Sequence, residues 1–206
     1  MESYSLKYSS AFDALIRKSQ FSQKGSDVGQ QEGLDLLCAL TGATAEKSGR
    51  FIFVGNGASA SFASHMALDW SKNGGVASLC LSDGTQLTAL GNDLGYEEVF
   101  SAPLDWHGKE NDVLVTISSS GNSENIVRSI RKAHELGLEV VSFSGLKPDN
   151  MSRQLADYSL YVPGLTYGMV ECAHQLWMHM WLDCYMNVME WDRDGCQNMS
   201  ASEFSL

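Results

Sequence analysis

The sequence has 206 residues, of which 44% are hydrophobic, as expected for one folded domain with a single core. Lysine and arginine number 14 against 25 aspartates and glutamates, and the resulting net charge of −11 repels the phosphate backbone of a nucleic acid. No run of about 20 apolar residues could span a membrane, so we expect neither nucleic acid nor membrane as a partner.

The cysteines indicate a reducing compartment. The five cysteines, an odd number, lie at Cys38, Cys80, Cys172, Cys184 and Cys196, with no CxxC spacing. This pattern disfavours a disulfide framework and a zinc ribbon. The first residues, MESYSLKYSSAFDALIRK, also lack the apolar core of a secretory signal. We therefore expect free thiols in a cytoplasmic protein.

The hydrophobic pattern predicts alternating helices and strands along most of the chain. The first helix has a weak apolar stripe at Phe12, Leu15 and Ile16. In chain order, the expected elements are a helix at 3–20, a helix at 30–47, a strand at 51–54, a helix at 59–70, a strand at 76–81, a helix at 86–90, a strand at 112–117, a helix at 123–136, a strand at 138–143, a helix at 151–155, a strand at 158–162 and a long helix at 169–189.

This alternation predicts an α/β fold, a three-layer sandwich with a mainly parallel sheet covered on both faces by helices. No linker or internal repeat divides the chain. We expect one domain at 1–190, including the N-terminal helices, and a polar C-terminal tail at 191–206.

The first motif that indicates chemistry is GNGAS, at residues 55–59, between a predicted strand and a predicted helix. Glycines there let the backbone turn tightly and approach a ligand, and the helix N-terminus offers N–H groups to an anion. A tight turn with Ser59 as a simple helix cap explains this motif equally well. The motif is not a dinucleotide-binding fingerprint, because its glycine spacing differs.

The second motif is ISSSGNSE, at residues 117–124, which also joins a strand to a helix and has four serines. Hydroxyls and helix-terminal N–H groups can hold a phosphate without a lysine. Ligands of open parallel sheets bind beyond the carboxyl ends of the strands, where both loops are expected. Two such loops together favour a phosphate pocket over two ordinary capped turns.

The sequences GNGASA, GND at residues 91–93, ISSSGNS and the long final helix together resemble the sugar isomerase (SIS) domain family, most closely its phosphoheptose isomerases. The resemblance covers roughly residues 49–189. It implies a flavodoxin-like α/β sandwich, usually a homotetramer with active sites between subunits. Members of the family interconvert ketose and aldose phosphates, or only bind phosphosugars.

The resemblance also implies roles for particular residues. Asp69 and His179 correspond to the catalytic pair. Asp69 replaces the family's glutamate, Glu171 replaces its glutamine, and Gly168 stands near the place of an aspartate that contacts substrate. The implied substrate-binding residues are Asn56, Ser59, Asp93, Ser118, Ser119, Ser120, Ser123 and Glu171.

Helical spacing alone suggests a second feature. His65 and Asp69 are four residues apart, and Glu171 and His179 lie on one stripe of the final helix with Gln175 midway. If the two helices converge, two histidines and two carboxylates would form a plausible site for a divalent metal, most plausibly zinc. The alternative is that each is a hydrogen-bonded histidine or a solvated carboxylate. His174 lies off this stripe, and we interpret it as a surface or hydrogen-bonded histidine.

The activity implied by the resemblance is aldose–ketose isomerisation, with sedoheptulose 7-phosphate converted to glycero-manno-heptose 7-phosphate through an enediol. Asp69 would be the base and His179 the acid. A metal held by His65, Asp69, Glu171 and His179 could instead polarise the carbonyl, although Asp69 cannot easily be both a tight ligand and a free base. The alternatives are a non-catalytic phosphosugar-binding or protein-tethering module and an isomerase of another sugar phosphate. The presence of Asp69 and His179 favours an enzyme.

Overall fold

The structure is a computed structural model that describes residues 3–189, so the expected tail at 191–206 lies outside the described residues. The strands are β1 (Gln20–Gln23), β2 (Ser26–Val28), β3 (Phe51–Gly55), β4 (Ser78–Cys80), β5 (Val113–Ser118), β6 (Glu139–Gly145) and β7 (Tyr158–Val162). The helices are α1 (Tyr4–Arg17), α2 (Gln30–Glu46), α3 (Ala58–Lys72), α4 (Gly84–Asp93), α5 (Ser101–His107), α6 (Glu124–Glu135), α7 (Met151–Leu155) and α8 (Tyr167–Tyr185), with a short 3-10 turn η1 (Tyr96–Glu98).

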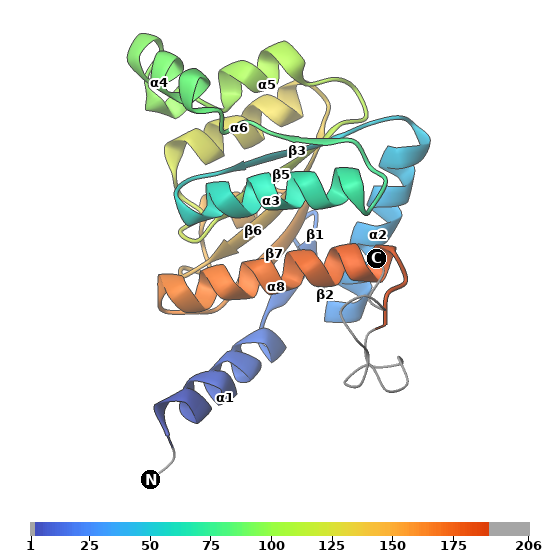
Figure 1. Cartoon of the computed structure of the whole chain (residues 1–206), viewed down its shortest axis with the longest axis vertical. Helices are drawn as coiled ribbons and strands as arrows, with labels where there is room; N and C mark the ends of the chain where they lie inside the picture. Colours follow the sequence, from blue (N-terminus) through green and yellow to red (C-terminus); the bar gives the residue numbers. More distant parts are fainter. Residues whose placement is uncertain (1–2, 190–206) are drawn as a thin grey trace, which may run out of the picture.

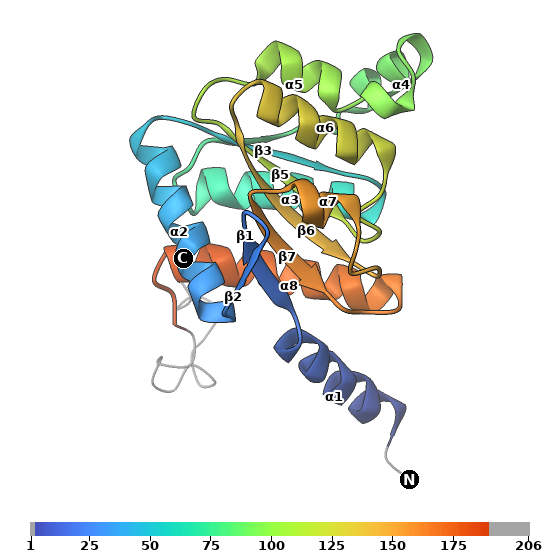
Figure 2. The same cartoon turned by 180° about the vertical axis from the view of Figure 1, so that it is seen from behind.

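The strands form one 7-stranded sheet in the order β2-β1-β7-β6-β5-β3-β4. The neighbours from β7 to β4 are parallel, whereas β1 pairs antiparallel with both β7 and β2. Helices α2, α3 and α8 lie on one face and α5, α6 and α7 on the other (Figures 1 and 2). The predicted three-layer α/β sandwich is therefore confirmed.

Both faces of the parallel strands are buried, which explains their unbroken apolar runs. In β3, Phe51 and Phe53 belong to the core under α2, α3 and α8, and Ile52 and Val54 belong to the core under α5 and α6. The alternation follows from the two-residue period of a strand. A run such as FIFV therefore has no polar face to turn to solvent.

The order of the strands creates the position for a ligand. From β3 the chain moves outward to β4 and then returns to β5 on the other side of β3. The loops after β3 and β5 therefore leave the same edge of the sheet in opposite directions. Crevices at such switch points are the usual ligand sites of open parallel sheets.

The sequence did not predict the β1–β2 hairpin, and the expected helix at 3–20 was wrong at its end. Helix α1 stops at Arg17, and Gln20 is already in a strand. Lys24 and Gly25 form the two-residue turn with φ of 48° and 80°. Positive φ at both positions is the geometry that matches the twist of a hairpin. The sequence also gave no prediction for α5 or η1.

Helix α8 ends earlier than the expected 169–189. The N–H of Asn187 donates to the carbonyl of Cys184 at 3.1 Å, and the N–H of Val188 donates to that of Asp183 at 2.8 Å. Asn187 has a φ of 56°. This is a Schellman cap, for which asparagine is a common substitute for glycine, so the apolar pattern continues past the helix end.

Helix α1 extends away from the body of the chain (Figure 1) and has no buried residue. The predicted stripe of Phe12, Leu15 and Ile16 packs, partly buried, against the core. Tyr4 and Leu6 on the same helix are exposed. Among the described residues, no helix is long and apolar enough to cross a membrane.

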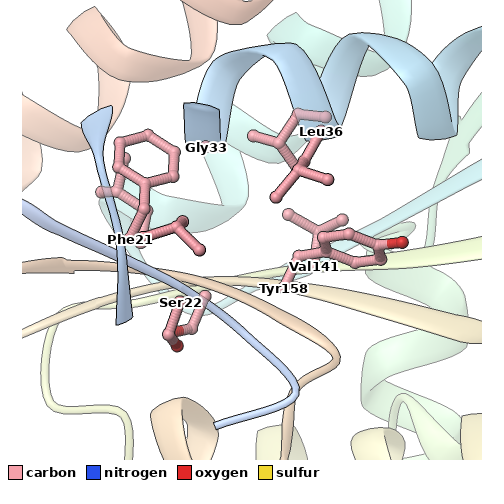
Figure 3. Close-up of a pocket in the computed structure, with 10 residues that line it drawn as sticks. Phe21, Ser22, Gly33, Leu36, Val141 and Tyr158 are labelled. Atoms are coloured by element: carbon pink, nitrogen blue, oxygen red, sulfur yellow. The ribbon is translucent and has the colours of Figure 1, made fainter. Parts of the chain in front are cut away.

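A small, partly open cavity lies between α2 and the antiparallel end of the sheet (Figure 3). Gly33 lets α2 approach β1 closely, since a Cβ at this position would lie 2.3 Å from the ring of Phe21. The cavity measures about 10 Å³ and is lined mainly by apolar side chains. This is room for about one water molecule, so the cavity cannot hold a metabolite.

Candidate functional site

A pocket of about 200 Å³ lies at the switch point, between the loops that follow β3 and β5. Its lining comes from these two loops and from the first turns of α8. The residues that line it are Asn56, Ser59, Ile117, Ser118, Ser119, Ser120, Ser123, Tyr167 and Glu171. Seven of the eight residues that the sequence predicted to bind substrate are therefore gathered in one place.

The loop after β5 offers hydroxyl and N–H groups to the pocket. The hydroxyls of Ser118 and Ser120 accept from the N–H groups of Gly121 and Asn122, at 3.2 and 3.3 Å, and each still has a proton to donate. Ser123 is the N-cap of α6, yet its side chain makes no capping hydrogen bond. The buried hydroxyl of Ser119 has no partner among the described residues. With the first turn of α6, these groups suit an anion.

Asn56 joins the two loops. Its amide and that of Asn125, at the start of α6, donate to each other, with both N···O distances 3.0 Å. Tyr96 adds a third hydrogen bond, from its hydroxyl to Oδ1 of Asn56 at 3.2 Å. Most of the hydrogen-bonding capacity of Asn56 is thus used within the chain. Asn125 was not predicted as a site residue, because its only signal in the sequence is its place in the first turn of a helix.

A second cluster lies where α3 and α8 pack together, on the face of the sheet that Figure 1 shows in front. Nε2 of His65 is 3.2 Å from Oδ2 of Asp69, and the rings of His65 and His179 are 5.4 Å apart between centroids. One ligand atom from each of these three residues lies within 4.8 Å of the others. The two helices therefore converge as the metal-site prediction requires.

Gln175 completes this cluster, and the sequence noted only its position on the stripe. Its Nε2 lies 2.8 Å from Nε2 of His179 and 3.7 Å from the sulfur of Met66 on α3. The amide can donate to the imidazole, which fixes the orientation of the ring.

The structure separates two of the predicted site residues from their expected neighbours. Glu171 lines the pocket with the serines and is not in the group of His65, Asp69 and His179. Asp93 is exposed at the end of α4, where it accepts from Nδ2 of Asn92 at 2.7 Å. Asp93 is not among the residues that line the pocket.

The donor set at the second cluster fits a divalent metal. Two imidazoles and one carboxylate are ligands that zinc accepts, and three protein ligands leave a fourth position for water or substrate. The side chain of His65 is 50% exposed and that of Asp69 16% exposed, so the set is reachable from solvent. This donor set contains three of the four predicted ligands, because Glu171 lies in the pocket and not in the cluster.

Fold and site together define a doubly wound α/β protein with a hydroxyl-lined pocket at its switch point and a histidine–carboxylate cluster nearby. The SIS domain profile matches residues 24–145, which is more than half of the chain. The chain belongs to the SIS domain family.

Three proteins similar to this chain share one name, phosphoheptose isomerase. Phosphoheptose isomerase of Helicobacter pylori (strain Shi470) is 37% identical over 182 residues, which are 84% of this chain and 94% of the relative. Phosphoheptose isomerase of Campylobacter jejuni (strain 81116) is 36% identical over 175 residues, 82% of this chain and 87% of the relative. The solved phosphoheptose isomerase of Neisseria gonorrhoeae is 28% identical with a TM-score of 0.72, covering 89% of this chain and 99% of that one.

Proposed function

We propose that this chain is a phosphosugar aldose–ketose isomerase that converts sedoheptulose 7-phosphate into glycero-manno-heptose 7-phosphate through an enediol. The relatives named phosphoheptose isomerase support this, at 36–37% identity over most of both chains. The observation that carries the proposal is the pairing of two features on the same helices. A hydroxyl-rich anion pocket and a histidine–carboxylate cluster lie along α3 and α8.

The spacing of these features suits a long substrate. Glu171 lines the pocket and His179 lies in the cluster, eight residues further along α8. With a rise of 1.5 Å per residue, the two positions are about 12 Å apart along the axis. A sugar phosphate whose phosphate is at the far end of the chain from C1 and C2 can reach both places.

In the proposed mechanism, the Ser118–Ser123 loop and the first turn of α6 hold the phosphate. Asp69 removes a proton from the carbon beside the carbonyl, and His179 donates a proton to the carbonyl oxygen to give the enediol. Asp69 then returns its proton to the former carbonyl carbon, and His179 takes the proton of the other enediol hydroxyl, whose oxygen becomes the new carbonyl; this completes the exchange of ketose and aldose. His65 orients Asp69, and Gln175 orients His179, through the contacts described above.

We include a divalent metal, most plausibly zinc, in the proposal. His65, Asp69 and His179 would hold the ion, whereas Glu171 would contact the substrate in the pocket. When bound, the ion supplies Lewis-acid polarisation of the sugar carbonyl. With the metal bound, Asp69 would be a ligand more than a free base, and His179 would be a ligand more than a free acid.

We also propose a cytoplasmic homotetramer with active sites between subunits. Exposed apolar side chains on and near α1 and α8 support association, among them Tyr4, Leu6 and Leu165, the last 91% exposed. The position of Asp93 outside the pocket of its own chain agrees with a role in the site of a neighbouring copy.

The test is turnover of sedoheptulose 7-phosphate, followed by NMR of the sugar, beside a panel of hexulose and pentulose phosphates. We expect the heptulose phosphate to be converted with the highest kcat/KM of the panel. A higher kcat/KM for a shorter sugar phosphate would mean that this sugar is the substrate, and the chain would still be a phosphosugar isomerase. Binding of these sugars without conversion of any would favour the non-catalytic phosphosugar-binding module.

A further inference from the structure

His174 is a buried histidine that the proposed mechanism does not use. It is on α8, between Glu171 and His179, and it is 0% exposed. One ring nitrogen, Nε2, lies 3.0 Å from the carbonyl oxygen of Ser144 in β6. Because the carbonyl only accepts, Nε2 carries the proton and donates it.

The other ring nitrogen of His174, Nδ1, is buried and has no partner among the described residues. A buried acceptor without a partner costs free energy, whereas an apolar side chain of similar size would not have this cost. Stability alone therefore does not explain a histidine at this position. An apolar side chain could fill the space, but it could not donate the hydrogen bond to Ser144.

Ser144 makes a second link, toward the opposite face of the sheet. Its hydroxyl accepts from Nδ2 of Asn150 at 3.2 Å. Asn150 is 0% exposed and caps α7, accepting the N–H of Arg153 at 2.9 Å. Helices α7 and α8 lie on opposite faces of β6 (Figure 2), so one serine connects the two layers.

The N-terminus of α7 in turn supports the phosphate loop. The N–H and hydroxyl of Ser152 both donate to the carbonyl of Gly121, at 2.8 and 2.9 Å. The N–H of Met151 donates to Oδ1 of Asn122 at 2.9 Å. Gly121 has a φ of 63°, and a Cβ at this position would lie 2.0 Å from Oδ1 of Asn150. The turn of the loop is thus held directly against Asn150.

We infer that His174 is a positioning residue: through Ser144 and Asn150 it fixes the helix that carries Glu171 and His179 relative to the loop at Ser118–Ser123. This inference rests on the proposed function, because it assigns the phosphate to the loop and the chemistry to α8. Displacement of the reacting groups by about 1 Å can cost on the order of 100-fold in rate. Loss of the link therefore acts on kcat more than on substrate affinity.

The experiment compares His174→Leu and His174→Gln with a matched control. The leucine removes the donor, and the glutamine keeps an N–H within reach of Ser144. The control is Thr41→Val, which removes the hydrogen bond from Nε1 of Trp181 to Oγ1 of Thr41 (3.0 Å). This bond also fastens α8 from a buried position, but it leads to α2 and not to the loop.

We expect His174→Leu to lower kcat for the sugar phosphate about 10-fold to 100-fold, with KM changed less than about threefold. His174→Gln should restore most of kcat, and Thr41→Val should leave kcat within about twofold although it also destabilises the fold. Equal kcat in His174→Leu and Thr41→Val would overturn the inference. If His174→Leu does not fold, Ser144→Ala cuts the link at the next bond, and an unchanged kcat there has the same meaning.

Hydrogen–deuterium exchange gives a second readout that needs no activity. In His174→Leu, and not in Thr41→Val, the amides of residues 121–122 and 151–152 should exchange faster. Faster exchange confined to α8 would overturn the inference. A wild-type protein that does not turn over any sugar phosphate would overturn the proposed function, and the exchange data would still decide the role of His174.

Discussion

At the scale of single residues, the distribution of charge is unusual for a pocket that is proposed to hold a phosphate. Neither lysine nor arginine lines the pocket, and Glu171 brings a carboxylate into it. In the proposed function, hydroxyls, N–H groups and the start of α6 would hold the anion through directed hydrogen bonds more than through net charge. The negative charge of Glu171 favours a contact with sugar hydroxyls, which can donate to it.

Asp69→Glu is the residue change that best separates a base from a metal ligand. The variant moves the carboxylate by one methylene while keeping its charge. If Asp69 is mainly a mobile base, the variant retains turnover. If the distances among Asp69, His65 and His179 are set by a metal, the variant loses both bound zinc and turnover. Turnover and metal content of the same preparation, measured beside wild type, decide between the two, since turnover without bound zinc excludes the ligand role.

The burial of His174 predicts an acid-sensitive fold. Desolvation lowers the pKa of His174 from 6.5 to about 4. Between these two pH values the unfolded chain binds the proton and the folded chain does not, so stability is present above pH 6.5 and is lost as the pH falls toward 4. The loss amounts to about 2 kcal/mol at pH 5. Urea unfolding at pH 7 and pH 5, at fixed protein concentration, measures it.

The control for this prediction is His174→Gln, which has no titrating group at the position. The difference in unfolding free energy between pH 7 and pH 5 should shrink by about 2 kcal/mol in this variant. An equal difference in wild type and variant would mean that other groups cause the acid sensitivity.

The residue-level site shows what a sequence can and cannot predict. The i,i+4 spacing of His65 and Asp69 was enough to place them on one face of a helix. Whether α8 brings Glu171 or His179 to that face depends on where the two helices cross, and helical spacing does not contain this angle. The role of Gln175 as a partner of His179 depends on the same crossing.

At the scale of elements, local signals decided which parts of the fold were predictable. The long apolar strands and the helices between them have strong periodicity, and the structure has a strand or helix at each predicted place. The β1–β2 hairpin has strands of four and three residues and a Lys-Gly turn, so neither the pattern nor the turn stood out. The end of α8 depends on the left-handed conformation of Asn187, which apolar periodicity does not predict.

We propose that the loop after β5 and the start of α6 act as one anion-binding element, and this proposal predicts the effect of Ser120→Ala with Ser123→Ala. Both side chains line the pocket without being fully buried, so the fold should be kept. Each hydrogen bond to a charged group that is lost should cost about 1.5–3 kcal/mol of phosphosugar binding. Calorimetry with the sugar phosphate measures the loss.

A suitable control for the loop is Ser61→Ala, an exposed serine on α3 that is not among the residues lining the pocket. Its affinity should equal that of wild type. Affinity unchanged in the double variant as well would remove the loop from the binding site and leave the phosphate to be held elsewhere.

At the scale of the whole molecule, the isolated chain leaves apolar surface uncovered. Helix α1 contacts α8 yet buries none of its residues completely, and Leu165 and Tyr167 are exposed beside the pocket-lining turn of α8. We predict a homotetramer in solution, near four times the chain mass of 22.5 kDa. Light scattering at micromolar concentration measures the mass. A monomer near 22.5 kDa would contradict the prediction and require each site to be complete within one chain.

In the proposed function, Asp69 and His179 isomerise a sugar phosphate that a separate loop anchors. The most direct measurement is turnover of sedoheptulose 7-phosphate by wild type, Asp69→Asn and His179→Ala, with binding of the same sugar by calorimetry. We predict that each variant loses about 100-fold to 10,000-fold in kcat while its dissociation constant changes little, because the phosphate anchor is intact. Wild-type turnover in both variants would contradict the assignment of the catalytic pair.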